Sequence, residues 1–291
     1  MNAYRRMTPS IPLVLAILAS ALVASAATSR PNPPGEPTEV RVSIGLLDVD
    51  GVDGAQQSFE ANVIYMASWQ DNRLKHDGVG TISRPVGEVW NPRLQLINQQ
   101  RAWTTLGEVV DISPSGEVVL MQRVWGSFSQ PLQLQEFPFD TQTFGVQLAA
   151  GGYTPDEVTL VSDESIPSGI AKSFSLPDWE ILGSKYWVSD YQAITTDTVR
   201  TSLFVCQFTA RRHAGYYLLK IIIPLVLIVA MSWIVFWIDP AESGTQIGVS
   251  TTAMLTLIAF RFTIDGLVPK SPTSPVWTFS SLAPLASFLR L

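Results

Sequence analysis

The residues with the clearest chemical periodicity lie near the carboxyl-terminal end, where small and hydroxyl side chains recur every three or four positions. On a helix this spacing brings six residues to one face: Gly248, Thr252, Leu255, Ala259, Phe262 and Gly266. Because lipid satisfies no hydroxyl group, such a face needs a neighbouring helix or water. The spacing leaves two interpretations open, close helix packing through small residues or the lining of a water-filled pore.

Residues that could support catalysis or bind a metal are sparse. The two histidines, His76 and His213, lack metal-ligand spacing, the single cysteine has no partner motif, and the chain contains no GxSxG. With one cysteine no intrachain disulfide can form, and we expect Cys206 to be a buried strand residue. The net charge of −6 argues against a nucleic-acid partner, which would require a basic face. We therefore predict no enzyme activity, no metal and no cofactor.

Two apolar segments must position this face of six residues, which we call the polar face. Residues 216–238 carry one charge, Lys220, and are long enough to cross a hydrocarbon core of roughly 30 Å at about 1.5 Å per residue. An Asp-Pro break at 239–240 separates these residues from a second apolar segment, which runs from Gly244 to Phe260. We expect helices over about 216–238 and 244–265, within a transmembrane domain at 211–269.

The amino-terminal end has the features of a secretory signal. Two arginines precede an apolar run from Ile11 to Val23 and then three small residues, which is the order typical of a signal peptide over residues 1–26. A retained anchor is the alternative, although the apolar run is short for one. In either case the next domain is exported, after a proline-rich lead-in at 27–39 that we expect to be disordered.

Residues 40–210 have the pattern of an all-β domain. Short runs rich in Val, Ile, Phe and Trp are separated by Gly, Pro, Asp and Asn, and the SPSG at 113–116 predicts a hairpin turn between two of them. We predict an immunoglobulin-like β-sandwich, large enough to bury its own core, followed by α-helical transmembrane segments.

Several motifs connect these segments with one family. WQDNRL begins at Trp69, FPFDTQTFGVQL begins at Phe137 with GYTPDEV after it, and the paired apolar segments continue to Pro269. WNP at 90–92 approximates a further motif, with Arg93 in place of an acid. Together these stretches resemble the pentameric ligand-gated (Cys-loop receptor) ion channels, and most closely the bacterial members.

The resemblance implies a subunit of a homopentamer in which a small-molecule ligand on the sandwich opens a pore for inorganic ions. In the family the second helix lines the pore, so the six-residue face matches its pore-facing positions and Leu255 its hydrophobic gate. The signature loop transmits the movement of the sandwich to the membrane domain. This implies coupling roles for Phe137, Pro138, Phe139, Asp140 and Arg212.

The signature loop lacks the two cysteines that crosslink it in eukaryotic members. We therefore expect packing of Phe137, Phe139 and Phe144 to hold the loop in place. For the earlier motif we expect a scaffolding role, with Trp69 in the core and Asp71 paired with Arg73.

The family binds its ligand between subunits in a cage of aromatic residues, which suits ammonium groups. Here Gly151 and Ile97 stand where many members have aromatic residues, so the cage is incomplete and a classical amine transmitter is not expected. Each remaining candidate could equally be ordinary sandwich packing. These candidates are Tyr153, Tyr186, Trp187 and Tyr191, with Arg123 contributed by the neighbouring subunit.

Ion selectivity is predicted from charges at the ends of the second helix. Glu242 lies near the cytoplasmic mouth, Asp265 near the outer mouth, and the linker lacks the arginine of anion channels, which favours cations. We expect contact with membrane lipid and a bacterial plasma-membrane location, with the sandwich on the extracytoplasmic side. Arg211 and Arg212 run against the positive-inside rule, so this orientation rests on the signal peptide.

Residues 270–291 depart from the family, which continues into two further helices. One allowed coding of Lys270–Phe279, read one frame over, gives VSYLARLDL, close to the family's continuation, so a frameshift is expected there. Two other functions stay open: a non-conducting, membrane-anchored β-sandwich that binds a ligand, and, with least support, a secreted hydrolase.

Overall fold

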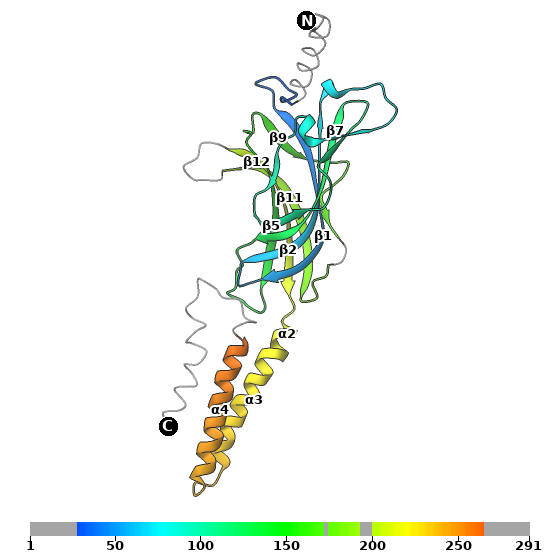
Figure 1. The fold of residues 1–291 in the computed structure, drawn as a ribbon. Coiled ribbons are helices and arrows are strands. Elements are labelled where there is room, and N and C mark those ends of the chain that lie inside the picture. The colour runs from blue at the N-terminus through cyan, green and yellow to red at the C-terminus, as the bar shows by residue number, and fades with distance from the viewer. Residues whose placement is uncertain (1–27, 172–173, 193–199, 265–291) are drawn as a thin grey trace, which may run out of the picture.

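An elongated β-sandwich with two long helices extending from one end makes up the part of the chain described by the computed structural model, residues 28–171, 174–192 and 200–264 (Figure 1). The predicted signal peptide and the atypical tail lie outside these residues. The strands are β1 (Thr38–Asp53), β2 (Ser58–Gln70), β3 (Ile82–Pro85), β4 (Leu94–Leu96), β5 (Gln99–Thr104), β6 (Val109–Ile112), β7 (Glu117–Ser129), β8 (Thr141–Ala150), β9 (Val158–Ser162), β10 (Gly169–Ile170), β11 (Trp179–Tyr191) and β12 (Thr201–Arg212). This confirms the predicted fold class.

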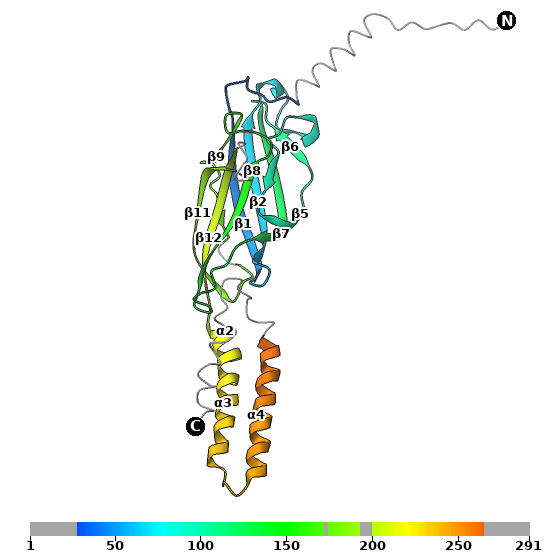
Figure 2. The ribbon, with the colours of Figure 1, turned by 90° about the vertical axis from the view of Figure 1, so that its left-hand side faces the viewer.

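The strands form two sheets that pack face to face. One sheet has eight strands in the order β10-β1-β2-β7-β6-β3, with β5 paired to β7 and β9 paired to β1. The other has the order β11-β12-β8-β4. In Figure 2, β11 and β12 lie on one side of the sandwich and β5, β6 and β7 on the other.

Buried and exposed side chains alternate along the strands, so that one face of a strand packs into the core. Along β7, Val118, Leu120 and Val124 are buried, whereas Met121 and Arg123 between them are exposed. Successive side chains of a strand point to opposite faces, so one face of β7 packs in the core and the other is left uncovered.

The centre of the core is an aromatic cluster. The Phe144 ring lies 5.3 Å from Phe59, 5.0 Å from Phe208 and 5.5 Å from Trp179, measured between ring centroids. Fully buried, Phe144 therefore holds its strand by packing, as predicted for a loop without cysteines. Cys206 is also buried in this layer, as expected, and burial raises the pKa of its thiol to about 11.

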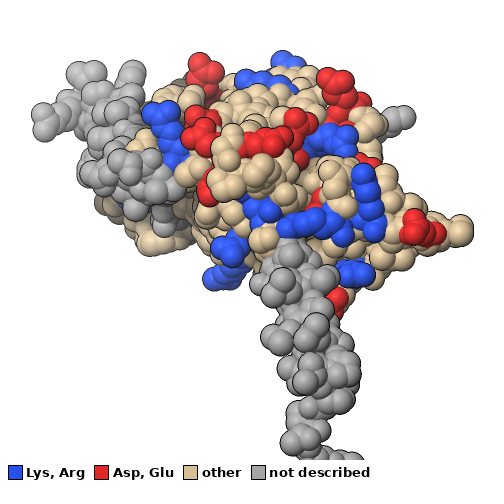
Figure 3. All heavy atoms as spheres, turned by 90° about the horizontal axis from the view of Figure 1, so that it is seen from above, with Lys and Arg blue, Asp and Glu red and all other residues tan. Residues whose placement is uncertain are grey.

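The pole of the sandwich away from the helices contains the predicted scaffold. Trp69 is buried, and the Asp71 carboxylate accepts hydrogen bonds from the Arg73 side chain at 2.8 and 2.7 Å. The predicted SPSG turn joins β6 to β7, and Gly116 has a φ of +80°, which favours glycine. Asp71 caps the start of a short 3₁₀ turn, η1 (Asn72–Leu74), where its side chain accepts a hydrogen bond from the Arg73 backbone N–H. Seen end-on, this pole shows acidic and basic side chains interspersed (Figure 3).

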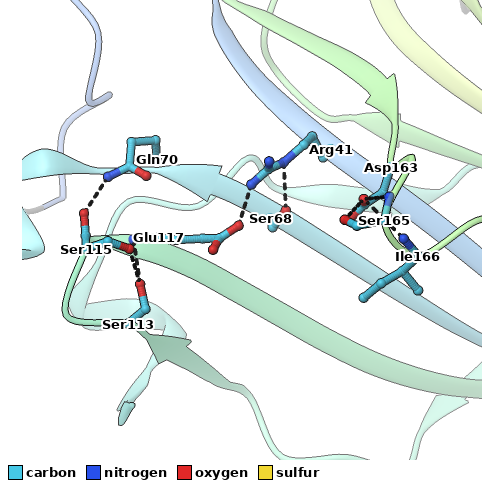
Figure 4. A network of polar contacts seen from close by, with 9 residues as sticks. All are labelled: Arg41, Ser68, Gln70, Ser113, Ser115, Glu117, Asp163, Ser165 and Ile166. Atoms are coloured by element: carbon cyan, nitrogen blue, oxygen red, sulfur yellow. Dashed lines mark hydrogen bonds and ion pairs between the residues drawn. The ribbon is translucent and has the colours of Figure 1, made fainter. Parts of the chain in front are cut away.

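Two groups of polar contacts lie near one another, one on β1, β2 and β7 and one in the loop after β9 (Figure 4). Arg41 on β1 donates to the Ser68 hydroxyl and forms an ion pair with Glu117. Asp163 accepts hydrogen bonds from Ser165 and from the following backbone N–H. Burial opposes ionisation of Asp163, but these hydrogen bonds and the charge of Arg41 outweigh it and lower its pKa.

The chain from Thr28 to β1, predicted as a disordered lead-in, is folded back against the sandwich in the structure. The Arg73 side chain donates to the Ser29 backbone carbonyl at 2.7 Å, and Arg30 donates to the Glu157 carbonyl at 3.1 Å.

Two helical segments leave the sandwich and lie side by side (Figures 1 and 2). The first consists of α2 (Gly215–Tyr217), the π-helical turn η3 (Leu218–Ile222), α3 (Ile223–Trp233) and the 3₁₀ turn η4 (Ile234–Trp237). The π turn ends just before Pro224, which has no N–H to donate to the preceding turn. The second segment is α4 (Ser243–Ile264). Both are long and apolar enough to cross a membrane.

Candidate functional site

A buried ion pair joins the signature loop to the strand that leads into the membrane helices. The Arg212 Nε donates to the Asp140 Oδ1 at 2.8 Å and Nη2 donates to Oδ2 at 3.1 Å, a bidentate arrangement. The two residues are only 7% and 2% exposed. The Arg212 backbone N–H also donates to the Asp140 carbonyl at 3.1 Å. The two segments are thus fixed to one another through both side chains and backbone.

Aromatic rings surround the Arg212 guanidinium. Its central carbon lies 4.2 Å from the Trp179 ring centroid, 5.0 Å from Phe137 and 5.5 Å from Tyr217. Its Nη1 donates to the Tyr217 hydroxyl at 3.2 Å, and the Phe137 and Tyr217 rings meet edge to face at 4.9 Å. We call these residues the coupling cluster: Phe137, Asp140, Trp179, Arg212 and Tyr217. Because Tyr217 belongs to α2, the cluster links the sandwich directly to the first membrane helix.

Of the five predicted coupling residues, Phe137 and Asp140 both contact Arg212. Pro138 is half-buried after a cis peptide bond. Phe139 is 63% exposed, so the prediction that its packing holds the loop is wrong. The loop is instead fixed through Asp140, whose Oδ2 also accepts a hydrogen bond from the Gln142 side chain at 2.6 Å.

Two members of the coupling cluster were not predicted from the sequence. Tyr217 lies five positions after Arg212, at the start of the first membrane helix, and this proximity was the available signal. Trp179 begins β11, where it pairs directly with Arg212 on β12. Only the sheet register brings these two residues together.

The predicted ligand residues on β11 divide between its two faces. Trp187 and Tyr191 share the outward face of the four-stranded sheet, whereas Tyr186 pairs with buried Cys206 and stacks on Phe204. The outward face contains a small apolar cluster of Ala149, Leu203 and Val205, with Ile97 and Tyr191 packed against it. The Lys185 ammonium lies 5.3 Å from the Trp187 ring centroid. The outward face of β11 therefore presents an aromatic surface, and the ammonium group of Lys185 from the same strand lies over one of its rings.

Tyr153 is occupied by contacts within its own chain. Its hydroxyl accepts a hydrogen bond from the Trp90 indole at 3.0 Å, and the Arg93 guanidinium lies 5.8 Å from its ring centroid. Arg123 lies on the outward face of β7 in the other sheet, where its Nε donates to Asn62 at 2.9 Å. A single chain thus does not bring Arg123 together with Trp187 and Tyr191, since the outward faces of the two sheets point in opposite directions.

The outward face of the eight-stranded sheet is unusually apolar around Arg123. Trp103 on β5 and Trp125 on β7 stack with ring centroids 5.1 Å apart, and the Trp125 indole donates to the Asp50 carboxylate at 2.8 Å. We give the name apolar face to six of the exposed apolar residues of this sheet and its loops: Leu47, Trp103, Leu106, Val109, Met121 and Trp125. Two exposed tryptophans stacked on one another are typical of a surface that binds a partner.

The polar face of α4 points away from α3. Ala253 is the buried residue of α4, and Val249, Leu257 and Phe260 on the same side are half-buried. Gly248, Thr252, Leu255, Ala259 and Phe262 are all exposed, on the opposite side of the helix. Packing against α3 therefore does not account for this face. Gly266, the sixth predicted member, lies outside the described residues.

Hydroxyl groups of α4 are satisfied as donors within the helix. The Thr252 Oγ1 donates to the Gly248 carbonyl at 2.8 Å, and Thr256 and Ser250 make the same bond one turn back at 2.8 Å. A hydroxyl whose hydrogen is engaged in this way presents only its oxygen lone pairs to the surroundings. The Thr252 position of the polar face therefore acts as a hydrogen-bond acceptor.

The linker between the two helices lies at the tip farthest from the sandwich (Figure 1). Glu242 is exposed there, one residue before α4, and its carbonyl accepts the backbone N–H of Thr245 at 3.0 Å. Its carboxylate accepts a weak hydrogen bond from the Thr245 hydroxyl at 3.4 Å. The negative charge is thus held beside the positive end of the helix dipole. Asp265, the other predicted selectivity residue, lies outside the described residues.

Within the described part of the chain, no three histidine, cysteine or acidic side chains are grouped so that they could hold a metal ion.

Sequence comparison with protein families finds two matches. The description "neurotransmitter-gated ion-channel ligand binding domain" matches residues 17–214. The description "neurotransmitter-gated ion-channel transmembrane region" matches residues 221–276. The first match covers the whole β-sandwich and the second covers most of both membrane helices.

Proposed function

Because the chain belongs to the neurotransmitter-gated ion-channel family, we propose that it forms a homopentamer in which a small molecule at the subunit interface opens a cation-selective pore. The families that match are channel domains and not enzymes. The proposed location is a bacterial plasma membrane, with the sandwich on the extracytoplasmic side and lipid around the helices. The predicted domain limits, a signal peptide at 1–26, the sandwich at 40–210 and the membrane domain at 211–269, belong to this proposal.

The coupling cluster is the observation that carries the proposal. A sandwich that merely bound a ligand would need no buried, bidentate ion pair between its loop and the strand entering the membrane. Here Asp140 and Arg212 form that pair, and Tyr217 extends it into the first helix. Movement of the sandwich would therefore be transmitted to α3 and α4.

The apolar face supports assembly with further copies of the chain. Trp103 and Trp125 would be covered in a pentamer by the neighbouring subunit, which removes apolar surface from water. The same arrangement would bring Arg123 of one subunit towards Trp187 and Tyr191 of the next. This would complete a site that no single chain holds.

The residues around this site favour a ligand with an acidic group. Arg123 on one side and Lys185 beside Trp187 on the other are both cationic. Two cations repel an ammonium group but bind a carboxylate through charge-assisted hydrogen bonds. We therefore propose a small aromatic or aliphatic carboxylate, with Tyr153 and Tyr186 supporting the site from behind.

Opening would be a shift between closed and open pores that exist before ligand binds. The ligand must bind the open arrangement more tightly, and coupling free energies of about 1–3 kcal/mol are typical of such links. In the closed pore, five Leu255 side chains would form a constriction that excludes water. Gly248, Thr252, Ala259, Phe262 and Gly266 would line the rest of the pore.

The experiment that tests this function is ion flux through vesicles containing the purified full chain, screened with small carboxylates and with amines. We expect a pentameric mass and flux evoked by a carboxylate. Arg123→Gln should raise the concentration required about tenfold, as for the loss of one charge-assisted bond. A pentamer that binds ligand without flux would support the non-conducting alternative, and a monomeric chain would contradict the proposal.

Cation selectivity is proposed from Glu242 and from the acceptor character of Thr252, with Asp265 adding charge at the outer mouth. Glu242→Lys should lower the cation-to-anion permeability ratio by at least about tenfold, because it reverses a ring of five charges at the cytoplasmic mouth of the proposed pore. The measurement is the reversal potential under a salt gradient. Glu136→Lys, an exposed charge reversal on the sandwich, is the control and should leave the reversal potential unchanged.

A further inference from the structure

A buried glutamine on β8, Gln142, is hydrogen-bonded both to the Asp140 carboxylate and to a second segment of the chain. Its side chain is only 3% exposed. The amide Nε2 donates to the Asp140 Oδ2 at 2.6 Å and to the Gln133 carbonyl at 2.6 Å. The amide Oε1 accepts the Gln133 backbone N–H at 3.0 Å. Both hydrogens of the amide nitrogen are therefore engaged, one of them by a charged acceptor.

The segment that contains Gln133 crosses from one sheet to the other. Residues 130–133, which we call the crossover segment, follow β7 of the eight-stranded sheet and lead towards the signature loop and β8 of the four-stranded sheet. The Gln130 side chain accepts the backbone N–H of Gly145 on β8 at 3.2 Å. The crossover segment is thus bonded to β8 at two places, through Gln130 and through Gln142.

The crossover segment is also bonded to the turn between β1 and β2. Gln57 in this turn accepts the Gln130 N–H with its backbone carbonyl at 2.8 Å and the Leu132 N–H with its Oε1 at 2.6 Å. Its Nε2 donates to the Gly54 carbonyl across the turn at 2.8 Å. Gln57 has a φ of +52°, which few residues other than glycine adopt unless their contacts hold them there. The side chain of Gln57 therefore both shapes the turn and attaches it to the crossover segment.

These hydrogen bonds form a continuous path from the turn between β1 and β2 to Arg212. The path connects the two sheets, which contribute different parts of the proposed ligand site: Arg123 is on the eight-stranded sheet and Trp187 on the four-stranded sheet. The ion pair belongs to the four-stranded side, because Arg212 ends β12 and Asp140 directly precedes β8. Movement of the eight-stranded sheet can reach the ion pair along this path.

The end of the path fixes the orientation of one carboxylate. The Arg212 guanidinium donates to both oxygens of Asp140, and Gln142 donates to one of them. Rotation of the carboxylate therefore breaks at least one charge-assisted hydrogen bond, each of which is stronger than a neutral one.

From these contacts we propose that Gln142 is a positioning residue for gating. Its amide sets the orientation of the Asp140 carboxylate towards Arg212 and ties it, through the crossover segment and Gln57, to the turn of the eight-stranded sheet. The role in gating rests on the proposed channel function, whereas the positioning of the ion pair does not. Ligand contact with either sheet would then act on the same equilibrium between closed and open pores.

The orientation of the ion pair can be read from Trp179, whose ring centroid lies 4.2 Å from the Arg212 guanidinium carbon. The full chain is labelled with 5-fluorotryptophan, and the fluorine NMR resonance of Trp179 is assigned by its absence in Trp179→Phe. We expect Gln142→Leu, which removes the amide, to shift this resonance in the absence of ligand. Gln57→Leu should also shift it, from the other sheet. Because Gln57 is only half-buried, this second variant decides the proposal if Gln142→Leu does not fold.

Gln122→Leu is the matched control. Gln122 is also a buried glutamine, 5% exposed, but its amide donates to the Gly107 carbonyl, which is not part of the path. This variant should leave the Trp179 resonance in place. A resonance that moves in none of the three variants, or equally in all of them, would overturn the positioning role. A shift in Gln142→Leu without one in Gln57→Leu would overturn the connection to the turn.

Flux evoked by benzoate, a small aromatic carboxylate, tests the role in gating. Gln142→Leu should raise the benzoate concentration for half-maximal flux about tenfold, as for the loss of one hydrogen bond to a charged group, and Gln122→Leu should not change it. An unchanged concentration in Gln142→Leu whose Trp179 resonance has moved would overturn the role in gating. If the unmodified chain carries no evoked flux, the channel proposal is contradicted, and the fluorine resonance still decides the positioning.

Discussion

Replacing Asp140 with asparagine is expected to abolish ligand-evoked flux and to lower the free energy of unfolding by about 3–5 kcal/mol. The Arg212 guanidinium, only 7% exposed, would keep its charge without its bidentate partner. The amide cannot accept two charge-assisted hydrogen bonds, so the contact between the signature loop and the strand before α2 is lost. Evoked flux in vesicles and chemical denaturation of the solubilised chain measure the two effects.

Asp71→Asn separates coupling from stability. Asp71 is also a buried carboxylate paired with an arginine, but it lies at the opposite pole of the sandwich, after the end of β2. We expect it to lower the free energy of unfolding while evoked flux persists in the folded protein. If Asp71→Asn and Asp140→Asn reduced evoked flux equally in folded protein, the ion pair at Arg212 would be a stabilising contact only.

Replacing Leu255 with serine is expected to give flux without ligand. Leu255 is 62% exposed on the face of α4 opposite to α3, so five copies would meet at the pore axis. Serine removes most of the apolar surface that excludes water. At about 1 kcal/mol for each subunit, five substitutions would shift the equilibrium towards the open pore by several kcal/mol. Basal flux before ligand is added is the measurement.

Met254→Ser is the matched control, because Met254 is 65% exposed on the same helix but lies outside the polar face. It should change basal flux little. If the Leu255→Ser protein assembled and still opened only in response to ligand, Leu255 would not be the gate residue. The double variant Asp140→Asn/Leu255→Ser should retain basal flux without any response to ligand, which would show that the coupling defect leaves the pore intact.

Most of the fold could be predicted from local pattern. The apolar runs predicted helices at about 216–238 and 244–265, and the structure has apolar helical spans at Leu218–Trp237 and Ser243–Ile264, because an apolar stretch of that length favours a helix that can cross a membrane. The SPSG turn and the Asp71–Arg73 pair depend on neighbours in the chain and were also predictable. Residue periodicity correctly grouped Gly248, Thr252 and Leu255 on one side of a helix.

Contacts made by tertiary register were not predictable. Trp179 and Arg212 are paired by the alignment of β11 with β12, which includes a bulge whose position the residues do not signal. Phe139 resembled a packing residue by type, but the neighbouring Asp140 turns inward to the ion pair and leaves Phe139 exposed.

Burial of the apolar face on association would make the folding free energy of the chain depend on the concentration of subunits. An isolated chain leaves Trp103, Trp125 and Met121 in contact with water. If these residues are buried only on association, part of the folding free energy belongs to the encounter between subunits, and mass action makes it depend on subunit density in the membrane. Sparse subunits would then be the form most exposed to proteolysis and aggregation, so the same tryptophans that complete the assembled receptor would limit the lifetime of an unassembled one.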